Sequence, residues 1–248
     1  MTHRSSLPTA LYCVLWALAW SPTAFAGLLY STSYEAPPYA IGPLDGQEGW
    51  ANSFGIDPIV TSGFARTGTQ SLEVRQGAGE DPFGLTFRDG PYSTSAPKVS
   101  VKHSVYLDDT DVWDFISPMA LGGDNGFIAQ LAIIDGLTAN LGLDGVSPVG
   151  VPISTERWID LELVLDFPTQ TVEGFVDGVS IGSGAFANPT EQLSRIEIFH
   201  IFDFTSTGPS NSFFVDDLTI SAVPLPSTVF LVLGGLLALV GRRELVGE

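Results

Sequence analysis

Short apolar runs, interrupted by glycine, proline and small polar residues, dominate the chain between residues 27 and 222. In residues 158–167 the odd positions from Ile159 to Phe167 are apolar, and most of the even positions are charged. A period of two places alternate side chains on opposite faces of a β-strand, so one face packs in a core and the other meets water. The pattern therefore predicts a half-buried antiparallel strand.

Two turn signals follow this strand. Residues 168–170, Pro-Thr-Gln, can reverse the chain before an apolar run at residues 171–176. Asp177 and Gly178 then supply the two positive-φ residues that a type I′ hairpin needs before residues 179–181. The segment is therefore predicted to be a meander of three antiparallel strands.

The same punctuation recurs along the rest of this segment, and no stretch keeps a helical period for long. Further strands are predicted at residues 28–34, 71–75, 85–88, 98–107, 127–134, 195–202 and 213–221. So many short strands in one domain require two packed sheets. The predicted fold class is all-β, a two-sheet antiparallel sandwich.

Three stretches of this segment carry a resemblance. Two of them resemble concanavalin A-like lectin and glucanase jelly rolls, the laminin-G-like branch in particular. They are the hairpin VEGFVDGVSIGSG at residues 172–184 and the ending SFFVDDLTISAVP, which would return beside LLYSTSYEA. The run LDGQEGWANSFGIDPIVTSGFARTGTQSLEV resembles the opening of exported jelly-roll domains, including carbohydrate-binding modules of the galactose-binding type. The resemblance implies a jelly-roll sandwich over residues 27–222 and a glycan-binding or adhesive role.

The first 26 residues have the layout of a cleaved secretory signal peptide. A positive start at Arg4 precedes an apolar stretch, and the small residues Ala24 and Ala26 mark a cleavage site before Gly27. The only cysteine, Cys13, would leave with the signal. A retained first helix fits less well, because the apolar stretch is short for a membrane span.

Residues 223–248 are predicted to form a separate tail. The run from residue 223 to residue 241 would be roughly 28 Å long as a helix, which spans a bilayer only marginally. Arg242 and Arg243 directly follow it, and the positive-inside rule places them in the cytoplasm. The tail therefore predicts a short C-terminal transmembrane helix.

The proline motif before this helix completes a second resemblance. Val223, Pro224, Leu225 and Pro226, the apolar run and the basic end resemble the PEP-CTERM sorting signal of Gram-negative bacteria, although Leu225 stands where that family has Glu. The resemblance implies a transient stay in the inner membrane, cutting near the motif by an exosortase-type protease, and release to the cell surface or the exopolysaccharide matrix. An ordinary single-span anchor is the alternative.

The charge balance of residues 27–222 excludes one class of partner. This segment holds 26 acidic and seven basic residues, a formal charge of −19. Such a surface repels nucleic acid and anionic lipid. A polysaccharide remains a candidate partner.

Catalytic patterns are weak in this sequence. Glucanases of the resembling fold place Glu-x-Asp-x-(x)-Glu on one strand, but Glu156, Asp160 and Glu162 have a wider first spacing and no second glutamate after them. His103 and His200 are the histidines after the signal, and neither lies in a nucleophile-elbow context such as Gly-x-Ser-x-Gly. We therefore expect a non-catalytic protein.

Two groups of carboxylates offer hard oxygen ligands for a structural calcium ion. Asp108, Asp109, Asp111 and Asp114 lie close together, but their run lacks the glycine and the final glutamate of an EF-hand. We expect solvated carboxylates and no cofactor.

The second group is Glu35 with Asp216 or Asp217, which would meet if the first and last strands pair. Trp50 and Trp113, set among glycine and aspartate, are candidate sugar-stacking platforms, with core packing as the stronger alternative.

The sequence thus predicts an exported protein with a signal peptide (1–26), a β-sandwich (27–222) and a sorting tail (223–248). The sandwich is expected to be a glycan-binding or adhesive module. A purely structural envelope protein, and a polysaccharide hydrolase or lyase, are the alternatives.

The sorting hypothesis predicts a precursor in the inner membrane and a mature protein that lacks Glu248. Changing Pro224 and Pro226 to Ala should leave insertion intact and block release, because the prolines precede the apolar run and act as an extended element presented to a protease. Intact-mass analysis of surface material and of the inner-membrane fraction checks this. Surface protein that still ends at Glu248, or normal release of the proline variant, would favour a permanent anchor.

Overall fold

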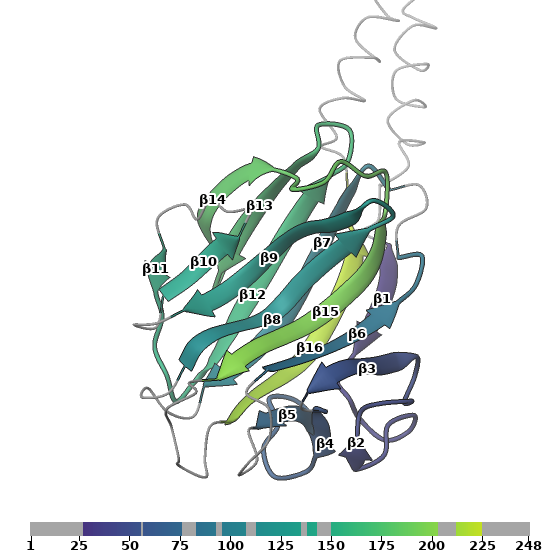
Figure 1. Cartoon of the computed structure of the whole chain (residues 1–248), viewed down its shortest axis with the longest axis vertical. Coiled ribbons are helices and arrows are strands. Elements are labelled where there is room, and N and C mark those ends of the chain that lie inside the picture. The colour runs from purple at the N-terminus through teal and green to yellow at the C-terminus, as the bar shows by residue number, and fades with distance from the viewer. Residues whose placement is uncertain are drawn as a thin grey trace, which may run out of the picture. The chain divides into compact units, whose positions relative to one another are not determined.

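The computed structural model describes residues 27–55, 57–75, 83–92, 96–107, 113–134, 138–142, 150–202 and 212–224. Within these ranges the chain forms strands and turns and no helix (Figure 1). No helix long and apolar enough to cross a membrane occurs in this part of the chain. The predicted signal peptide and transmembrane helix lie outside the described residues.

The described strands form two antiparallel sheets, which Figure 1 shows as two layers. Sheet A has the order β14 (Val179–Ala185), β13 (Thr171–Val176), β12 (Trp158–Asp166), β7 (Lys98–Leu107), β16 (Ser212–Ala222), β5 (Ser71–Arg75), β4 (Ile59–Thr61) and β2 (Gly42–Pro43), and β1 (Leu28–Thr32) also pairs with β16. Sheet B has the order β11 (Val151–Pro152), β10 (Thr138–Gly142), β9 (Gly126–Ile134), β8 (Trp113–Gly123), β15 (Leu193–Phe202), β6 (Phe83–Asp89) and β3 (Trp50–Gly55). The prediction of an all-β, two-sheet antiparallel sandwich is confirmed.

The predicted meander is confirmed in its details. β12, β13 and β14 are consecutive neighbours in sheet A. Asp177 and Gly178 have φ angles of 49° and 76° between the paired residues Val176 and Val179, as a type I′ turn requires. The last strand also returns beside the first, with Leu28 opposite Ser221.

One central strand, β8, was not predicted. Its sequence contains Pro118 and ends in Gly122-Gly123, and these residues interrupt a strand pattern. In the structure Pro118 lies where the pairing with β9 shifts register, between Ile116 and Met119. A bulge tolerates a proline because the missing N–H is not needed for the ladder there.

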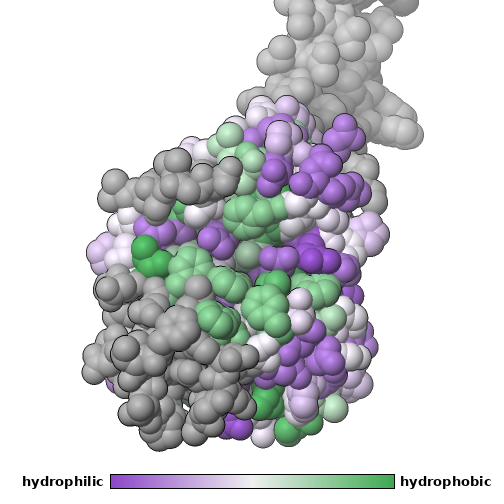
Figure 2. Space-filling model, in the orientation of Figure 1, coloured by the Kyte–Doolittle hydropathy of each residue, from purple (hydrophilic) through white to green (hydrophobic). Residues whose placement is uncertain are grey.

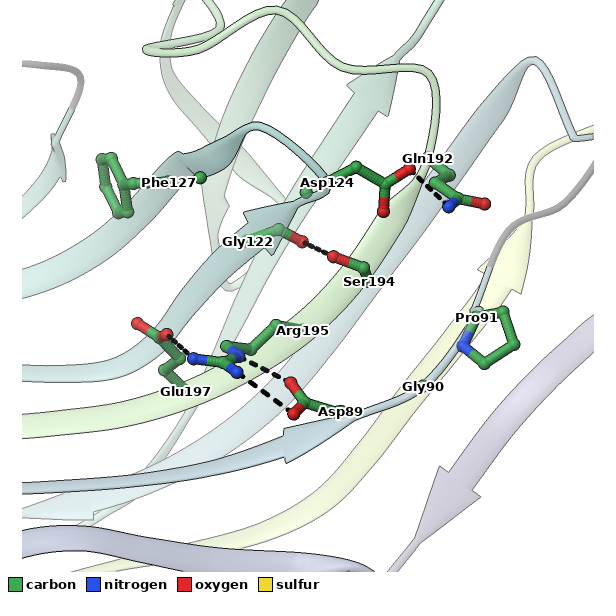
Figure 3. A pocket seen from close by; sticks show the side chains of 12 residues that line it. Asp89, Gly90, Pro91, Gly122, Asp124, Phe127, Gln192, Ser194, Arg195 and Glu197 are labelled. Carbon is green, nitrogen blue, oxygen red and sulfur yellow. Dashed lines mark hydrogen bonds and ion pairs between the residues drawn. The ribbon is translucent and has the colours of Figure 1, made fainter.

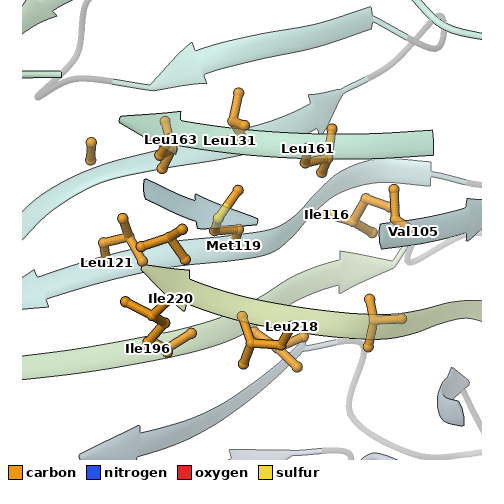
Figure 4. Close-up of a cluster of buried hydrophobic side chains, with 14 of the residues drawn as sticks. Val105, Ile116, Met119, Leu121, Leu131, Leu161, Leu163, Ile196, Leu218 and Ile220 are labelled. Carbon is orange, nitrogen blue, oxygen red and sulfur yellow. The ribbon is translucent and has the colours of Figure 1, made fainter. Parts of the chain in front are cut away.

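The core fills the space between the sheets (Figure 4). Leu161 and Leu163 of β12 are fully buried, as are Ile116 and Leu121 of β8. Burying a side chain of this size stabilises the fold by about 1.5 to 3 kcal/mol. Each buried residue also sends its chain neighbours to the outer face of its sheet, because side chains alternate along a strand.

Truncating a core side chain should therefore destabilise the fold far more than truncating the outward-facing residue next to it. Leu163→Ala should lower the free energy of unfolding of the 27–222 segment by about 2 to 5 kcal/mol, because it leaves a cavity between the sheets. Val164→Ala, half-buried on the outer side of the same strand, should cost less than about 1 kcal/mol. Urea unfolding followed by circular dichroism measures both. Equal losses, or a helix-dominated spectrum without a cooperative transition, would contradict the sandwich.

Candidate functional site

The outer face of sheet B is defined most clearly by β15. Ile196 and Ile198 are fully buried, whereas Arg195, Glu197 and Phe199 are half-buried and alternate with them. The last three side chains therefore point away from the core. No motif marks this face in the sequence, although the alternation along β15 places Phe199 on the same side as two charged residues.

Small residues lie beside these side chains on one neighbouring strand. Ser117, Ala120 and Gly122 of β8 are the partners of Phe199, Glu197 and Arg195. On the other side, β6 presents larger residues, since Leu85, Phe87 and Asp89 are the corresponding partners. The middle of the face therefore has a floor without long side chains, next to bulkier neighbours.

Hydrophobic side chains gather across this face, and hydrophilic ones lie beside them (Figure 2). The rings of Phe115 and Phe199 meet edge-on, with their centroids 5.8 Å apart. Phe54 and Phe83, at the β3 and β6 side, are 47% and 36% exposed. Accessible rings on a sheet face provide flat apolar surfaces that a ligand can cover.

An ion-pair cluster adjoins the aromatic surface (Figure 3). Arg195 donates two hydrogen bonds to Asp89, at 2.6 and 3.1 Å, and its guanidinium lies 3.7 Å from Glu197. The same guanidinium stacks 4.2 Å above the centre of the Phe87 ring. Burial raises the pKa of Glu197, and the nearby Arg195 only partly offsets this effect.

A depression of about 520 Å³ opens beside this cluster, between the end of β6, the β8–β9 turn and the start of β15. Its walls include Asp124, whose carboxylate accepts a 2.6 Å hydrogen bond from Gln192, and the ring of Phe127. Glycine forms part of its floor. A Cβ atom at Gly122 would lie 3.2 Å from the Cβ of Arg195, so a larger residue there would crowd the space beside the guanidinium.

The glucanase-like carboxylates do not assemble into a site. Asp160 and Glu162 lie on the outer side of β12 in sheet A, as the alternation predicts. Asp160 forms an ion pair with Arg66, and Glu162 lies 3.3 Å from the Lys102 ammonium. Glu156 precedes the strand in a positive-φ turn, with φ of 57°. Their partners make Asp160 and Glu162 structural.

The two histidines are core residues. His103 lies between the sheets, with Nδ1 2.9 Å from the Pro118 carbonyl oxygen and Nε2 3.2 Å from the Tyr34 hydroxyl. A carbonyl oxygen only accepts, so Nδ1 carries the proton and Nε2 accepts from Tyr34. Burial lowers the pKa of His103 and of His200 to about 4, so both rings are neutral at neutral pH.

Trp50 is 1% exposed and donates its indole N–H to the Tyr39 hydroxyl at 3.2 Å, so it fills the core and offers no sugar-stacking platform. The side chain of Trp113 lies outside the described part of the structure.

The carboxylates at the first and last strands hold a loop. Glu35 accepts hydrogen bonds from the backbone N–H groups of Thr69 and Gln70, at 2.7 and 2.6 Å. Asp216 accepts from the backbone of Arg66 and Thr67, at 2.9 and 3.2 Å. These two acids therefore fasten the loop before β5 to the segment after β1 and to β16. Asp217 also accepts a hydrogen bond from the Thr67 hydroxyl, at 2.6 Å.

Metal ligation has no support in the described residues. No group of three or more histidine, cysteine, aspartate or glutamate side chains there could hold a metal ion. Asp108, Asp109 and Asp111 lie outside the described residues, as does the side chain of Asp114.

Most of the predicted processing residues also lie outside the described part: Ala24, Ala26, Leu225, Pro226, Arg242 and Arg243. Gly27 is described, and its carbonyl accepts a 2.8 Å hydrogen bond from the backbone of Ala222. The N–H of Val223 donates to the Lys98 carbonyl at 2.9 Å, and Pro224 is exposed. The sheet therefore holds the chain up to Val223.

The fold is shared with solved jelly-roll structures. It is similar to the catalytic domain of a glycoside hydrolase family 131 protein from Coprinopsis cinerea, at 11% identity and a TM-score of 0.55 over 78% of this chain and 95% of that chain. It is also similar to a conserved carbohydrate esterase from Shiga toxin-encoding bacteriophage phi24B, at 14% identity and a TM-score of 0.54 over 79% of this chain and 99% of that chain.

A sialidase matches 79% of this chain at 11% identity and a TM-score of 0.54, and the matched region spans 19% of the sialidase. No protein-family model matches the sequence, and no curated protein is significantly similar to it. At identities this low, the structural similarity shows a common jelly-roll fold and nothing about the site.

The loop contact of Glu35 gives a pH-dependent prediction. Burial opposes its charge, but the N–H and hydroxyl groups of Thr69 and Gln70 outweigh burial and lower its pKa. Such a group stabilises the fold above its unfolded-state pKa, and the stabilisation is lost as pH falls through the lower folded-state pKa. Glu35→Gln should lower the melting temperature by roughly 2 to 4 °C at neutral pH, and the difference should vanish in acid.

Differential scanning calorimetry across the acid range measures this difference. Glu191→Gln, at an exposed position, is the matched control and should melt as the wild type does. A Glu35→Gln deficit that persists unchanged at low pH would mean that the charge does not fasten the loop.

Proposed function

We propose that this protein is a glycan-binding module whose binding surface is the outer face of sheet B. The observation that carries the proposal is the set of accessible aromatic rings on that face, directly beside a depression that charged side chains line. The C–H faces of sugar rings pack on aromatic side chains, while sugar hydroxyls need charged or polar partners. Phe115, Phe127 and Phe199 supply the first kind of contact, and Asp89, Asp124, Gln192 and Arg195 supply the second.

The neighbouring folds support this proposal in a general way. The glycoside hydrolase and the carbohydrate esterase are carbohydrate-acting proteins by name, and both share this sandwich over nearly their whole length. A sheet face of such a fold is thus a suitable support for carbohydrate contacts. The residues that make the contacts here are this chain's own.

Hydrolysis is the second candidate function, because Glu197 has a raised pKa and Asp89 lies across Arg195 from it. Glycoside cleavage uses two carboxyl groups, one of which is protonated. We favour binding over catalysis because the Arg195 guanidinium is already paired with both carboxylates. A purely structural envelope role is a third possibility, which predicts no ligand for this face.

We further propose that the protein acts outside the cytoplasm, at the cell surface or in the exopolysaccharide matrix of a Gram-negative bacterium. Its signal peptide would be removed before Gly27, and an exosortase-type protease would release it from the inner membrane by cutting near Val223–Pro226. The contact between Gly27 and Ala222 supports this route, since both cleavage points would then lie at the same end of the paired strands β1 and β16.

A glycan array probed with the full-length chain, purified in detergent, tests the proposed function. Phe199→Ala should weaken binding to the glycans that the wild type selects by roughly tenfold, because about 1.4 kcal/mol of aromatic contact is lost. Phe175→Ala is the matched control, since Phe175 is a half-buried phenylalanine on the outer side of β13 in sheet A.

Binding lost in Phe175→Ala and kept in Phe199→Ala would show that the wrong face was chosen, and the absence of any bound glycan would favour the structural role. Mass spectrometry of the bound glycans adds a check on hydrolysis. Shortened products that disappear in Glu197→Gln would identify an enzyme.

A further inference from the structure

The depression on the outer face of sheet B is richer in acid than in base. Asp89, Asp124 and Glu197 line it, and Arg195 is the one basic residue among its described lining residues. We propose that this depression selects amine-bearing glycans, such as polymers of de-N-acetylated amino sugars, and excludes polyanionic glycans. The inference rests on the proposed glycan-binding function of the same face and specifies the class of its ligand.

The charge of Arg195 is already paired with two protein carboxylates. Its guanidinium makes two hydrogen bonds to Asp89 and an ion pair with Glu197, and its flat side covers the Phe87 ring. A ligand carboxylate or sulfate that paired with the same two N–H groups would have to displace Asp89 from a bidentate pair, which is a strong kind of side-chain ion pair. It would then lie between two protein carboxylates.

A ligand ammonium group meets the opposite situation. Asp124 is exposed at the β8–β9 turn, and one of its oxygens accepts a hydrogen bond from Gln192 that fixes the orientation of the carboxylate. An ammonium brings three donors and no acceptor, so it satisfies carboxylate oxygens that a neutral acetamido group satisfies less well. It would also offset the cost of keeping Glu197 charged while it is only 22% exposed.

The arrangement suits a cationic sugar chain better than a bound metal ion. The three acids are distributed around the depression, and no set of three acidic or histidine side chains converges on one point anywhere in the described residues. The volume of about 520 Å³ falls in the range of small-ligand sites, and the aromatic surface continues from it along the face. The strongly acidic domain, with its formal charge of −19, would also speed the approach of a polycation.

The test is titration calorimetry of the full-length chain in detergent with hexamers of glucosamine, N-acetylglucosamine, glucose and galacturonate. At low salt and at a mildly acidic pH that protonates the sugar amines, the glucosamine hexamer should bind roughly tenfold more tightly than the N-acetylglucosamine hexamer. The galacturonate hexamer should show no binding. The preference for the amine should weaken as salt is added, because the interaction is between charges.

Two variants test whether the preference for the amine arises in this depression. Glu197→Gln and Asp124→Asn should each lower the ratio of the glucosamine affinity to the N-acetylglucosamine affinity by roughly three- to tenfold. Glu173→Gln, which removes a carboxylate from the outer side of β13 in sheet A, is the matched control and should leave that ratio unchanged. The ratio is measured within one protein sample, so a general loss of stability does not imitate the effect.

The outcomes separate the two proposals. Equal affinity for the glucosamine and N-acetylglucosamine hexamers, or binding of galacturonate as tight as that of glucosamine, would overturn the amine preference and leave the glycan-binding function standing. An unchanged ratio in both variants would overturn the assignment to this depression. If none of the hexamers binds, the proposed function and this inference fall together.

Discussion

The packing of the two inner sheet faces against one another is the constraint on which the rest of the structure depends. Leu161 and Leu163 from sheet A, and Ile116 and Ile196 from sheet B, are fully buried in this layer. Because side chains alternate along a strand, each residue that enters the core fixes the direction of the next one. The chemistry of the outer face of sheet B is therefore a consequence of core packing.

A buried histidine forms hydrogen bonds across this apolar layer. His103 of β7 in sheet A contacts the carbonyl of Pro118 at the bulge of β8 in sheet B. The bulge would otherwise leave that carbonyl buried without a partner, at a cost of about 1 to 3 kcal/mol. Tyr34 completes the chain of hydrogen bonds from the other side of the ring. A neutral histidine thus joins the sheets where the regular ladder is interrupted.

Much of the fold could be predicted from the sequence, because a period of two is a direct signal of a half-buried strand. The limits of residues 71–75, 98–107 and 171–176 are those of the observed strands. β8 could not be predicted, because a proline within a strand pattern argues against a strand. Pro118 is tolerated in β8 only because it lies at a bulge in the pairing with β9. The short strands β2 and β11 depend on their neighbours in the same way, because two residues carry no period.

The candidate site was harder to predict from the sequence than the fold. The alternation in β15 orients Phe199 and Glu197, but it does not indicate that Asp89 lies opposite Arg195, since that contact joins residues more than a hundred positions apart in the chain. The conspicuous acids Asp160 and Glu162 proved to be structural partners of Arg66 and Lys102. Rare residue types and acidic runs attract attention in a sequence, whereas this site consists of ordinary phenylalanines and one ion-pair cluster.

Hydroxyl-radical footprinting of phenylalanine side chains tests the central claim most directly, because it reports which face a ligand covers. The full-length chain would be oxidised with and without a pool of neutral and amine-bearing hexasaccharides, and the modified positions would be located by peptide mass spectrometry. Our account predicts that the sugars protect Phe115 and Phe199 on the outer face of sheet B and leave Phe175 on sheet A unprotected. Protection of Phe175, or equal oxidation of all three residues with and without the sugars, would contradict it.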